Sequence, residues 1–401
     1  MAYDKNILLP VGKLLNLEVK INNKICLLEC FVLAGDGPAL IGRQWLAAFD
    51  YWPLQLRNGK NNIYNLNIEN VAKDLSKKYT KLFSNTPGEY NRSKTKLVLE
   101  KNVKPIAMKY RHVAHALSPL IEEELERLMK LGYLVPVEVS EWATPIVPIF
   151  KDNGKIRICG DFKVTINKHL LSDKYGLHII DDIFFKLQGG SKFNELDLKH
   201  AYMQFPVDEE SSKLLTIVTN KGMFRYNKLT EGVATAPPDC QRKMDECLSS
   251  LDGVIAYIDN IYVTGKTDEE HRRNLDLVCK RLQDCNLRLN LSKCFFMKDK
   301  LEVLGFVVNK NGLHKAKSKV QAMVDAPQPR NQKELESFLG LINFYARFLE
   351  NRSHRLRPLY ELSHKNKFVW NAECDRAFTW VKEELISPRV LVNYDPKEKV
   401  Y

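Results

Sequence analysis

Apolar and polar positions change their spacing along the chain, and these changes separate regions of different predicted structure. Residues 7–21 and 24–33 are apolar runs with loose alternation, which is typical of short strands. The turn sequence 35–38, Gly-Asp-Gly-Pro, then breaks the chain. A polar stretch rich in Asn and Lys follows from about residue 57 to 95. The pattern therefore predicts a small all-β segment over residues 1–56 and a linker over 57–95.

A helix is predicted from Ser118 onward. Ser118 suits the N-cap, Pro119 suits the first helical position, and the acidic residues 122–124 suit the first turns. Gly132 follows the last residue of the helical pattern and is a typical stop signal. The apolar face of this helix consists of Leu125, Leu128 and Met129.

Further along, extended runs and a helical segment do not alternate strictly. The runs 144–150 and 155–162 are joined by a turn at 151–155 and predict a basic hairpin. Another strand begins at Asn194, and residues 254–264 form an apolar hairpin with polar residues at its tip. The segment APPDCQRKMDECLSSL lies between them and predicts a helix with a proline-marked start. This order predicts an α+β domain with an antiparallel sheet.

After Gly312 the pattern becomes helical. Asn331, with Glu334 three residues later, is a plausible helix start. Apolar residues then recur at spacings of three and four and share one predicted helix face: Leu335, Phe338, Ile342, Tyr345 and Leu349. We interpret this stripe as core packing.

The composition indicates a class of binding partner but leaves an alternative open. The 401 residues are 44% hydrophobic and 27% charged, as in ordinary globular proteins, and carry a formal net charge of +12. Such a basic chain attracts nucleic acid or an anionic membrane, although a basic protein without a polyanionic partner fits the composition equally well.

The cysteines and the hydropathy pattern limit the cellular compartments in which the protein is expected. The nine cysteines are scattered, odd in number and never spaced as Cys-x-x-Cys, which indicates a reducing compartment. No run approaches the roughly 18 apolar residues that span a bilayer, and the N-terminus lacks a signal-peptide pattern. We expect a cytoplasmic chain, or one in the nucleus or in virus-like particles, with no membrane partner.

Two aspartates stand where strands end. Asp197 leaves an apolar strand and Asp259 lies at the tip of the 254–264 hairpin. Carboxylates on adjacent strand ends can hold two Mg²⁺ ions for in-line phosphoryl transfer. Asp259-Asn260 is also a sequence that a type I′ turn favours, because both residues tolerate positive φ. The hairpin alone therefore leaves a metal site and an ordinary turn open.

Ordered motifs around these residues carry a family resemblance. They are SEWATPIVPIFKDNGKIRICGDFKVTINKHL, GGSKFNELDLKHAYMQFPV, KGMFRYNKLTEGVATAPPDCQRKMD, GVIAYIDNIYVTG and, further on, ELESFLGLINFYARF. In this order they resemble the reverse transcriptase of a gypsy-class LTR retrotransposon, over about residues 96 to 401. The resemblance implies a right-hand polymerase, with fingers and palm over 96–310 and a helical thumb over 311–365.

The resemblance implies a catalytic site with two Mg²⁺ ions. Asp197 and Asp259 match the metal-binding carboxylates of the family, and Asn260 takes the place of the third. An amide oxygen binds Mg²⁺ more weakly than a carboxylate, so we expect reduced polymerase turnover. The implied partners are an RNA template, a DNA primer, their RNA–DNA hybrid and deoxynucleoside triphosphates; the oligomeric state stays open. The alternative is a catalytically inactive relic that still binds nucleic acid.

The same resemblance implies a nucleotide site. Tyr202 matches the residue that stacks under the incoming sugar and excludes a ribose 2′-hydroxyl, and Arg157 matches the arginine that clamps the triphosphate. Lys151 and Lys155 are candidate helpers, and are equally well explained as solvated turn lysines. Glu231 departs from the family pattern, and a carboxylate there is expected to repel the triphosphate or to lose its own charge.

Both ends resemble parts of neighbouring domains. KICLLECFVL and LIGRQWL, within residues 1–56, resemble the C-terminal half of a retroviral-type aspartic protease. No Asp-Thr-Gly or Asp-Ser-Gly occurs in the chain, so no protease activity is expected. Residues 366–401 resemble the connection that leads into RNase H, whose first carboxylate is expected after Tyr401, so no RNase H activity is expected either.

Overall fold

The structure is a computed structural model that divides into two units, residues 1–67 and 68–401. It describes residues 2–3, 6–7, 10–21, 24–33, 64–151, 154–171, 175–365, 367–388 and 391.

The first unit contains antiparallel strands up to residue 33. β1 (Ala2–Tyr3) pairs with β2 (Asn6–Ile7), and β3 (Pro10–Ile21) pairs with β4 (Lys24–Leu33). The strands predicted from the runs 7–21 and 24–33 therefore occur. The predicted break at 35–38 and the LIGRQWL run lie outside the described residues.

The predicted linker over 57–95 is wrong for residues 64–78, which form helix α2 (Tyr64–Lys78). Val71 and Leu75 on this helix are buried, and so are Tyr79, Leu82 and Tyr90 after it. The Tyr79 hydroxyl donates to Asp276 Oδ1 at 2.8 Å and fixes the end of α2 against α7 (Asp268–Asp284). The apolar residues recur at helical spacing, but the many Asn and Lys residues around them mask the pattern.

The second unit begins with a five-stranded sheet in the order β5-β10-β9-β6-β7. The predicted hairpin is confirmed, since Phe150 at the end of β6 pairs with Ile156 at the start of β7. Only the β6–β9 pair within this sheet is parallel. The strands are β5 (Leu134–Val137), β6 (Thr144–Phe150), β7 (Ile156–Gly160), β9 (Thr216–Thr219) and β10 (Gly222–Tyr226).

Helix α3 (Ser118–Lys130) packs against β7 and confirms the predicted helix, with one difference at its start. Leu117 is the N-cap, so Ser118 is already helical and makes no side-chain cap. Gly132 has φ +71°, the left-handed conformation that ends many helices.

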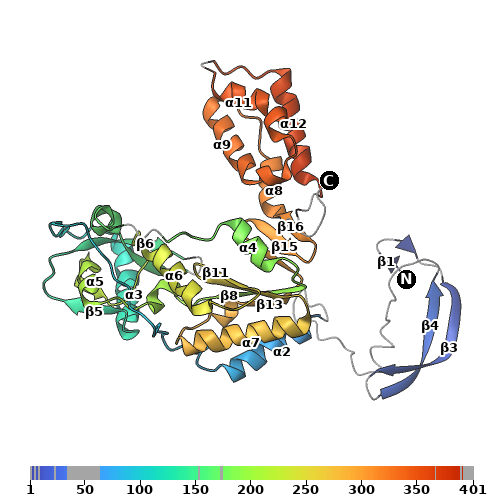
Figure 1. Ribbon diagram of the computed structural model, residues 1–401, viewed down its shortest axis with the longest axis horizontal. Coiled ribbons are helices and arrows are strands. Elements are labelled where there is room, and N and C mark those ends of the chain that lie inside the picture. Colours follow the sequence, from blue (N-terminus) through green and yellow to red (C-terminus); the bar gives the residue numbers. More distant parts are fainter. Residues whose placement is uncertain are drawn as a thin grey trace. The chain divides into compact units, whose positions relative to one another are not determined.

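The central sheet is antiparallel, in the order β11-β12-β8-β13. Its strands are β11 (Val254–Tyr257), β12 (Asn260–Gly265), β8 (Lys192–Asp197) and β13 (Phe295–Lys298). Helices α6 (Ala236–Leu248) and α7 pack against this sheet, as does α4 (Ile180–Leu187) (Figure 1).

Both faces of the central sheet are covered. Ile261 and Val263 of β12 belong to the core formed with α6 and α7, whereas Tyr262 belongs to the core formed with α4 and the C-terminal helices. The period of two along the strand thus divides its side chains between two apolar clusters. A sheet buried on both faces is a rigid support for groups at the ends of its strands.

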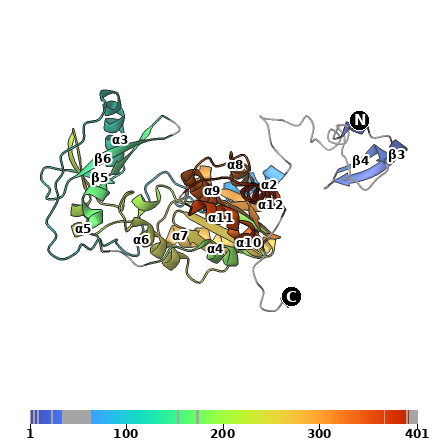
Figure 2. The same cartoon turned by 90° about the horizontal axis from the view of Figure 1, so that it is seen from above.

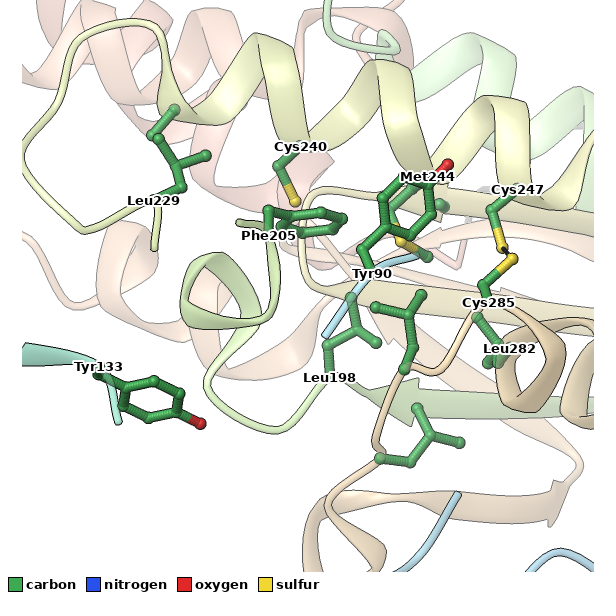
Figure 3. Close-up of a cluster of buried hydrophobic side chains, with 14 of the residues drawn as sticks. Tyr90, Tyr133, Leu198, Phe205, Leu229, Cys240, Met244, Cys247, Leu282 and Cys285 are labelled. Carbon is green, nitrogen blue, oxygen red and sulfur yellow. Dashed lines mark hydrogen bonds between the residues drawn. The ribbon is translucent and has the colours of Figure 1, made fainter. Parts of the chain in front are cut away.

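Helix α6 supplies much of the first core. Cys240, Met244 and Cys247 project from it toward Tyr90 and the residues below (Figure 3). Their spacing of four and three residues places them on one helix face. The Cys247 and Cys285 sulfurs face one another at 2.8 Å, and both are free cysteines.

The C-terminal part starts with a three-stranded sheet, β14-β15-β16. The expectation of helix directly after Gly312 is wrong, because β16 (Gly312–Lys315) completes this sheet with β14 (Lys300–Val303) and β15 (Phe306–Asn309). Helices α8, α9, α11 and α12 then gather into one bundle, seen from two sides in Figures 1 and 2. The helices here are α8 (Lys317–Val324), α9 (Gln332–Phe344), α10 (Arg352–Arg355), α11 (Arg357–Ser363) and α12 (Ala372–Ile386). Among the described residues, no helix combines the length and the apolar character needed to cross a membrane.

The predicted start of α9 is confirmed, since Asn331 Oδ1 accepts from the Glu334 N–H at 3.0 Å. The apolar stripe is buried at all five positions, but α9 ends at Phe344. Tyr345 and Leu349 therefore pack from the turn after the helix, where the Tyr345 hydroxyl donates to the Gly305 carbonyl at 2.5 Å.

A buried ion pair within α6 is hydrogen-bonded to Thr95, in the segment before α3. Lys243 Nζ lies 2.6 Å from Asp239 Oδ2, and both side chains are buried. The Thr95 hydroxyl donates to the same carboxylate oxygen at 2.6 Å. Burial lowers the pKa of Lys243, opposed by the charge of Asp239.

We predict that Lys243→Met destabilises the fold by about 3 kcal/mol, because it leaves the Asp239 carboxylate buried with less compensation. Urea denaturation of the whole chain measures this loss. Lys213→Met, which removes an exposed pair with Glu210, is the matched control and should leave the midpoint unchanged. Equal midpoints for the two variants would contradict the prediction.

Candidate active site

The ends of β8 and β12 place the predicted metal-binding residues together. Asp197, the last residue of β8, is the register partner of Asn260, the first residue of β12. The Leu198 N–H donates to the Asp259 carbonyl at 3.0 Å, and the Asn290 N–H donates to the Asp197 carbonyl at 2.9 Å. Backbone hydrogen bonds thus hold both aspartates at one edge of the sheet.

The turn differs from the type I′ alternative considered for Asp259-Asn260. Tyr257 pairs with Asn260, so the two turn residues are Ile258 and Asp259. Ile258 has φ +55°, and Asp259 is not among the residues with positive φ. A β-branched residue with positive φ is strained. The backbone strain therefore falls on Ile258, and Asn260 is a strand residue.

Negative charge is concentrated around this edge. Burial raises the pKa of Asp197, the Lys293 ammonium 3.7 Å away lowers it, and the charge of Asp259 raises it again. Burial also raises the pKa of Glu195, with smaller contributions from Asp197 and Asp259. A cation bound here would relieve this repulsion.

The sequence analysis missed Glu195 and Lys293. Glu195 precedes Asp197 by two residues on one strand, so strand periodicity places both on the same face and could have identified it. Lys293 is distant in sequence, and no local pattern marks it.

The donor set fits a divalent metal ion such as Mg²⁺. Asp197, Asp259 and Asn260 offer hard oxygen ligands, the type that Mg²⁺ prefers. Within the described ranges, no group of three or more His, Cys, Asp or Glu side chains is arranged to hold a metal ion. Asn260 adds an amide oxygen beside the two carboxylates. Asn260 also hydrogen-bonds to Tyr262, two residues further along β12.

Tyr202 lies in the 3₁₀ turn Ala201–Gln204 and is half-buried. Burial raises its pKa, and the charges of Cys240, Asp259 and Glu231 raise it further, so the phenol stays neutral.

Arg157 and Glu231 form an ion pair, with Nη1 and Oε1 2.5 Å apart. The Cys159 thiol donates to the other carboxylate oxygen at 3.7 Å. The sequence analysis expected Glu231 to repel a triphosphate or to lose its charge. It did not foresee that Arg157, the proposed triphosphate ligand, is the partner that balances this charge.

Gly232 brings the Glu231 loop close to β7. It has φ +90°, and a Cβ atom there would lie 2.8 Å from the Gly160 carbonyl oxygen. The Asn167 side chain holds the loop by donating to the Gly232 carbonyl at 2.7 Å and accepting from the Ala234 N–H at 2.9 Å. A side chain at position 232 would push Glu231 away from Arg157.

Lys151 and Lys155 flank the turn between β6 and β7, whose residues 152 and 153 lie outside the described ranges. The Lys151 N–H donates to the Lys155 carbonyl at 2.8 Å. Burial lowers the pKa of Lys151. The charge of Glu124 raises this pKa, and the charge of Arg157 lowers it. Lys155 is exposed. Their part in nucleotide binding stays a prediction.

Cys159 reports on the Arg157–Glu231 pair. Burial and the Glu231 charge raise the pKa of Cys159 to about 11, whereas Arg157 lowers it. We predict that Glu231→Gln speeds alkylation of Cys159 by iodoacetamide at pH 8 several-fold, because more thiolate is present. Arg157→Gln should slow it. Peptide mass spectrometry measures both rates, and equal effects of the two substitutions would contradict the pairing.

Comparison with known proteins identifies the family. Residues 149–308 match the family described as reverse transcriptase (RNA-dependent DNA polymerase). An uncharacterised Caenorhabditis elegans protein, K02A2.6, is 32% identical over 316 residues, which are 78% of this chain and 25% of that protein. The Tf2-7 transposon polyprotein of Schizosaccharomyces pombe is 28% identical over 283 residues, 70% of this chain and 21% of the polyprotein.

Solved structures share the fold. A foamy viral protease-reverse transcriptase in complex with double-stranded DNA has a TM-score of 0.71 and 23% identity, covering 94% of this chain and 71% of that one. The same protein in complex with an RNA/DNA hybrid has a TM-score of 0.66 and 22% identity, covering 94% and 55%. The predicted α+β right-hand polymerase fold with an antiparallel palm sheet is confirmed.

The chain spans about a quarter of the length of the curated relatives that it matches. Its family match begins at the end of β6 and includes β7, the strands β8 and β12 that end or begin at Asp197 and Asn260, and the intervening helix α6. The ordered motifs, the family match and the transposon relatives agree: residues 149–308 form a reverse transcriptase domain, and over most of its length the chain is similar to retrotransposon polyproteins.

Proposed function

We propose that the chain is an RNA-directed DNA polymerase, which adds deoxynucleotides to a primer on an RNA template. One observation carries the proposal. The β8–β12 register and the Leu198–Asp259 hydrogen bond hold Asp197 and Asp259 together at a strand edge, in a chain of the reverse transcriptase family.

The proposed metal ligands are Asp197 and Asp259, with the Asn260 amide oxygen in the third position. When bound, two Mg²⁺ ions would stabilise the attacking and leaving oxygens of the in-line transfer. Asn260 offers a neutral oxygen in place of a carboxylate, so less negative charge is available to balance the charge of the two Mg²⁺ ions. We therefore propose a polymerase whose turnover is impaired.

The proposed nucleotide site is lined by Tyr202 and Arg157. The neutral, half-buried ring of Tyr202 offers a flat surface for the sugar of the incoming nucleotide and would collide with a ribose 2′-hydroxyl. The Arg157 guanidinium can bind two phosphate oxygens at once. It must exchange Glu231 for the phosphates to do so, and Lys151 and Lys155 are proposed helpers.

Nucleic acid partners follow from charge and from the solved relatives. The relatives' structures were determined with double-stranded DNA and with RNA/DNA hybrid. The net charge of +12 suits such polyanions, with an affinity that falls as salt rises. We propose an RNA template, a DNA primer and their hybrid as partners.

The finer family and domain assignments also remain proposals. We assign the chain to the gypsy class, with fingers and palm over residues 96–310, a thumb over 311–365 and a connection over 366–401. The order of the quoted motifs supports these bounds. The segment 1–56 is proposed to be a protease remnant.

A second candidate is a catalytically inactive relic that binds nucleic acid. Asn260 and Glu231 favour it, because one removes a metal-binding charge and the other engages Arg157. Both candidates keep the fold and the net positive charge, and turnover distinguishes them.

We predict that Asn260→Asp raises the rate of Mg²⁺-dependent primer extension on an RNA template by about tenfold or more, which is ~1.4 kcal/mol of transition-state stabilisation. The added carboxylate restores charge at the metal site. Single-nucleotide addition under saturating substrate measures the gain.

Asp197→Asn is the negative control and should abolish extension. If Asn260→Asp gives no gain over the unaltered chain, charge loss at position 260 does not limit turnover. If every variant fails to extend primers yet binds hybrid, the relic reading holds.

We predict that Glu231→Gln lowers the KM for deoxynucleoside triphosphates by roughly two- to fivefold, the effect expected from losing one partly exposed ion pair. Arg157 and Glu231 side chains are 49% and 39% exposed, which limits the strength of their pairing. Steady-state extension measures KM, and the change should shrink at high salt. An unchanged or higher KM would show that Glu231 does not compete with the triphosphate.

A further inference from the structure

The turn that carries Asp259 needs support from outside the hairpin. Ile258 has φ +55°, a conformation that strains a β-branched residue and persists only where its surroundings enforce it. In the β11–β12 register, Tyr257 and Asn260 pair across the turn. The Ile258 N–H instead donates to Gln241 Oε1 of helix α6, at 2.9 Å.

Gln241 uses its whole side-chain amide in this contact. Its Nε2 donates to the Ala256 carbonyl at 3.0 Å and to Asp245 Oδ1 at 2.9 Å. The side chain is fully buried. A flipped amide would place oxygen against two acceptors and nitrogen against a donor, so the orientation is fixed.

Asp245 fixes the amide from the next turn of α6. Its Oδ1 also lies 3.0 Å from His178 Nε2, and its Oδ2 accepts from the Tyr175 hydroxyl at 2.7 Å. The carboxylate therefore ties Gln241 to the segment before α4. Helix α6 is itself anchored, since Cys240 and Met244 point into the core (Figure 3).

We propose that Gln241, oriented by Asp245, is a positioning residue that holds Ile258 in its strained conformation and so fixes Asp259 beside Asp197. Gln241 hydrogen-bonds to the hairpin backbone on both sides of Tyr257, at Ala256 and at Ile258. Without it, Ile258 would relax to negative φ, and the Asp259 carbonyl would lose its bond from Leu198. The inference concerns the turn itself; only its catalytic consequence rests on the polymerase function proposed above.

The first test replaces the amide by an apolar side chain of similar size. Gln241→Leu should lower the affinity of the chain for Mn²⁺, titrated by electron paramagnetic resonance, by about tenfold, and should lower kcat for primer extension by tenfold to a hundredfold. The KM for deoxynucleotides should change less than threefold, because the proposed nucleotide residues are untouched. Mn²⁺ binding needs no turnover, so it decides the inference even if the chain is an inactive relic.

The second test is rescue by Ile258→Gly. Glycine adopts positive φ without strain, so the turn no longer needs the hydrogen bond to the Gln241 amide. In the Gln241→Leu background, Ile258→Gly should restore most of the Mn²⁺ affinity and of the midpoint of urea denaturation. The same change in the unaltered chain should give a smaller gain, and the difference measures the coupling.

Gln204→Leu is the matched control. Gln204 is equally buried and its amide also makes three hydrogen bonds, to Lys199 and Arg288. Its loss should destabilise the fold, but Ile258→Gly should not relieve that loss. Rescue of both variants alike, or of neither, would overturn the proposal, and so would unchanged Mn²⁺ affinity in Gln241→Leu.

Discussion

The structure depends on holding two like charges side by side at the edge of a sheet that is buried on both faces. The charge of Asp259 raises the pKa of Asp197, and burial penalises the charged form of Asp197 further. Backbone interactions hold the two residues in place despite this cost. The β8–β12 register and the backbone hydrogen bonds from Leu198 and Asn290 restrict the positions of both aspartates. The two cores on either face of the sheet make that backbone rigid, and Lys293 offsets part of the charge.

Both departures from the family pattern alter the balance of charge in the same region. Asn260 removes a negative charge where cations are proposed to bind, and Glu231 adds one where a triphosphate is proposed to bind. Glu231 is neutralised locally by Arg157, and the loop geometry at Gly232 makes that pairing possible. The fold tolerates both changes, because neither residue is part of a hydrophobic core. Their effect is expected on turnover rather than on folding.

Sequence patterns predicted the elements whose signals are local. The β6–β7 hairpin, helix α6, the Asn331 cap and the strand ends at Asp197 and Asp259 all carry periodicity or turn residues that identify them. Helix α2 was missed because its apolar residues are few and its polar residues resemble those of a linker. Strand β16 was missed because four residues are too short to show a period. The pairings Arg157–Glu231 and Gln241–Ile258 join segments far apart in sequence, so only the tertiary structure shows them.

The central claim is that Asp197 and Asp259 together form a cation site in this chain as it stands, with Asn260 beside them. Direct titration with Mn²⁺, followed by electron paramagnetic resonance, tests it without requiring catalysis. The account predicts saturable binding that is lost in Asp197→Asn and strengthened in Asn260→Asp. Binding of equal strength in the unaltered chain and in Asp197→Asn would contradict it.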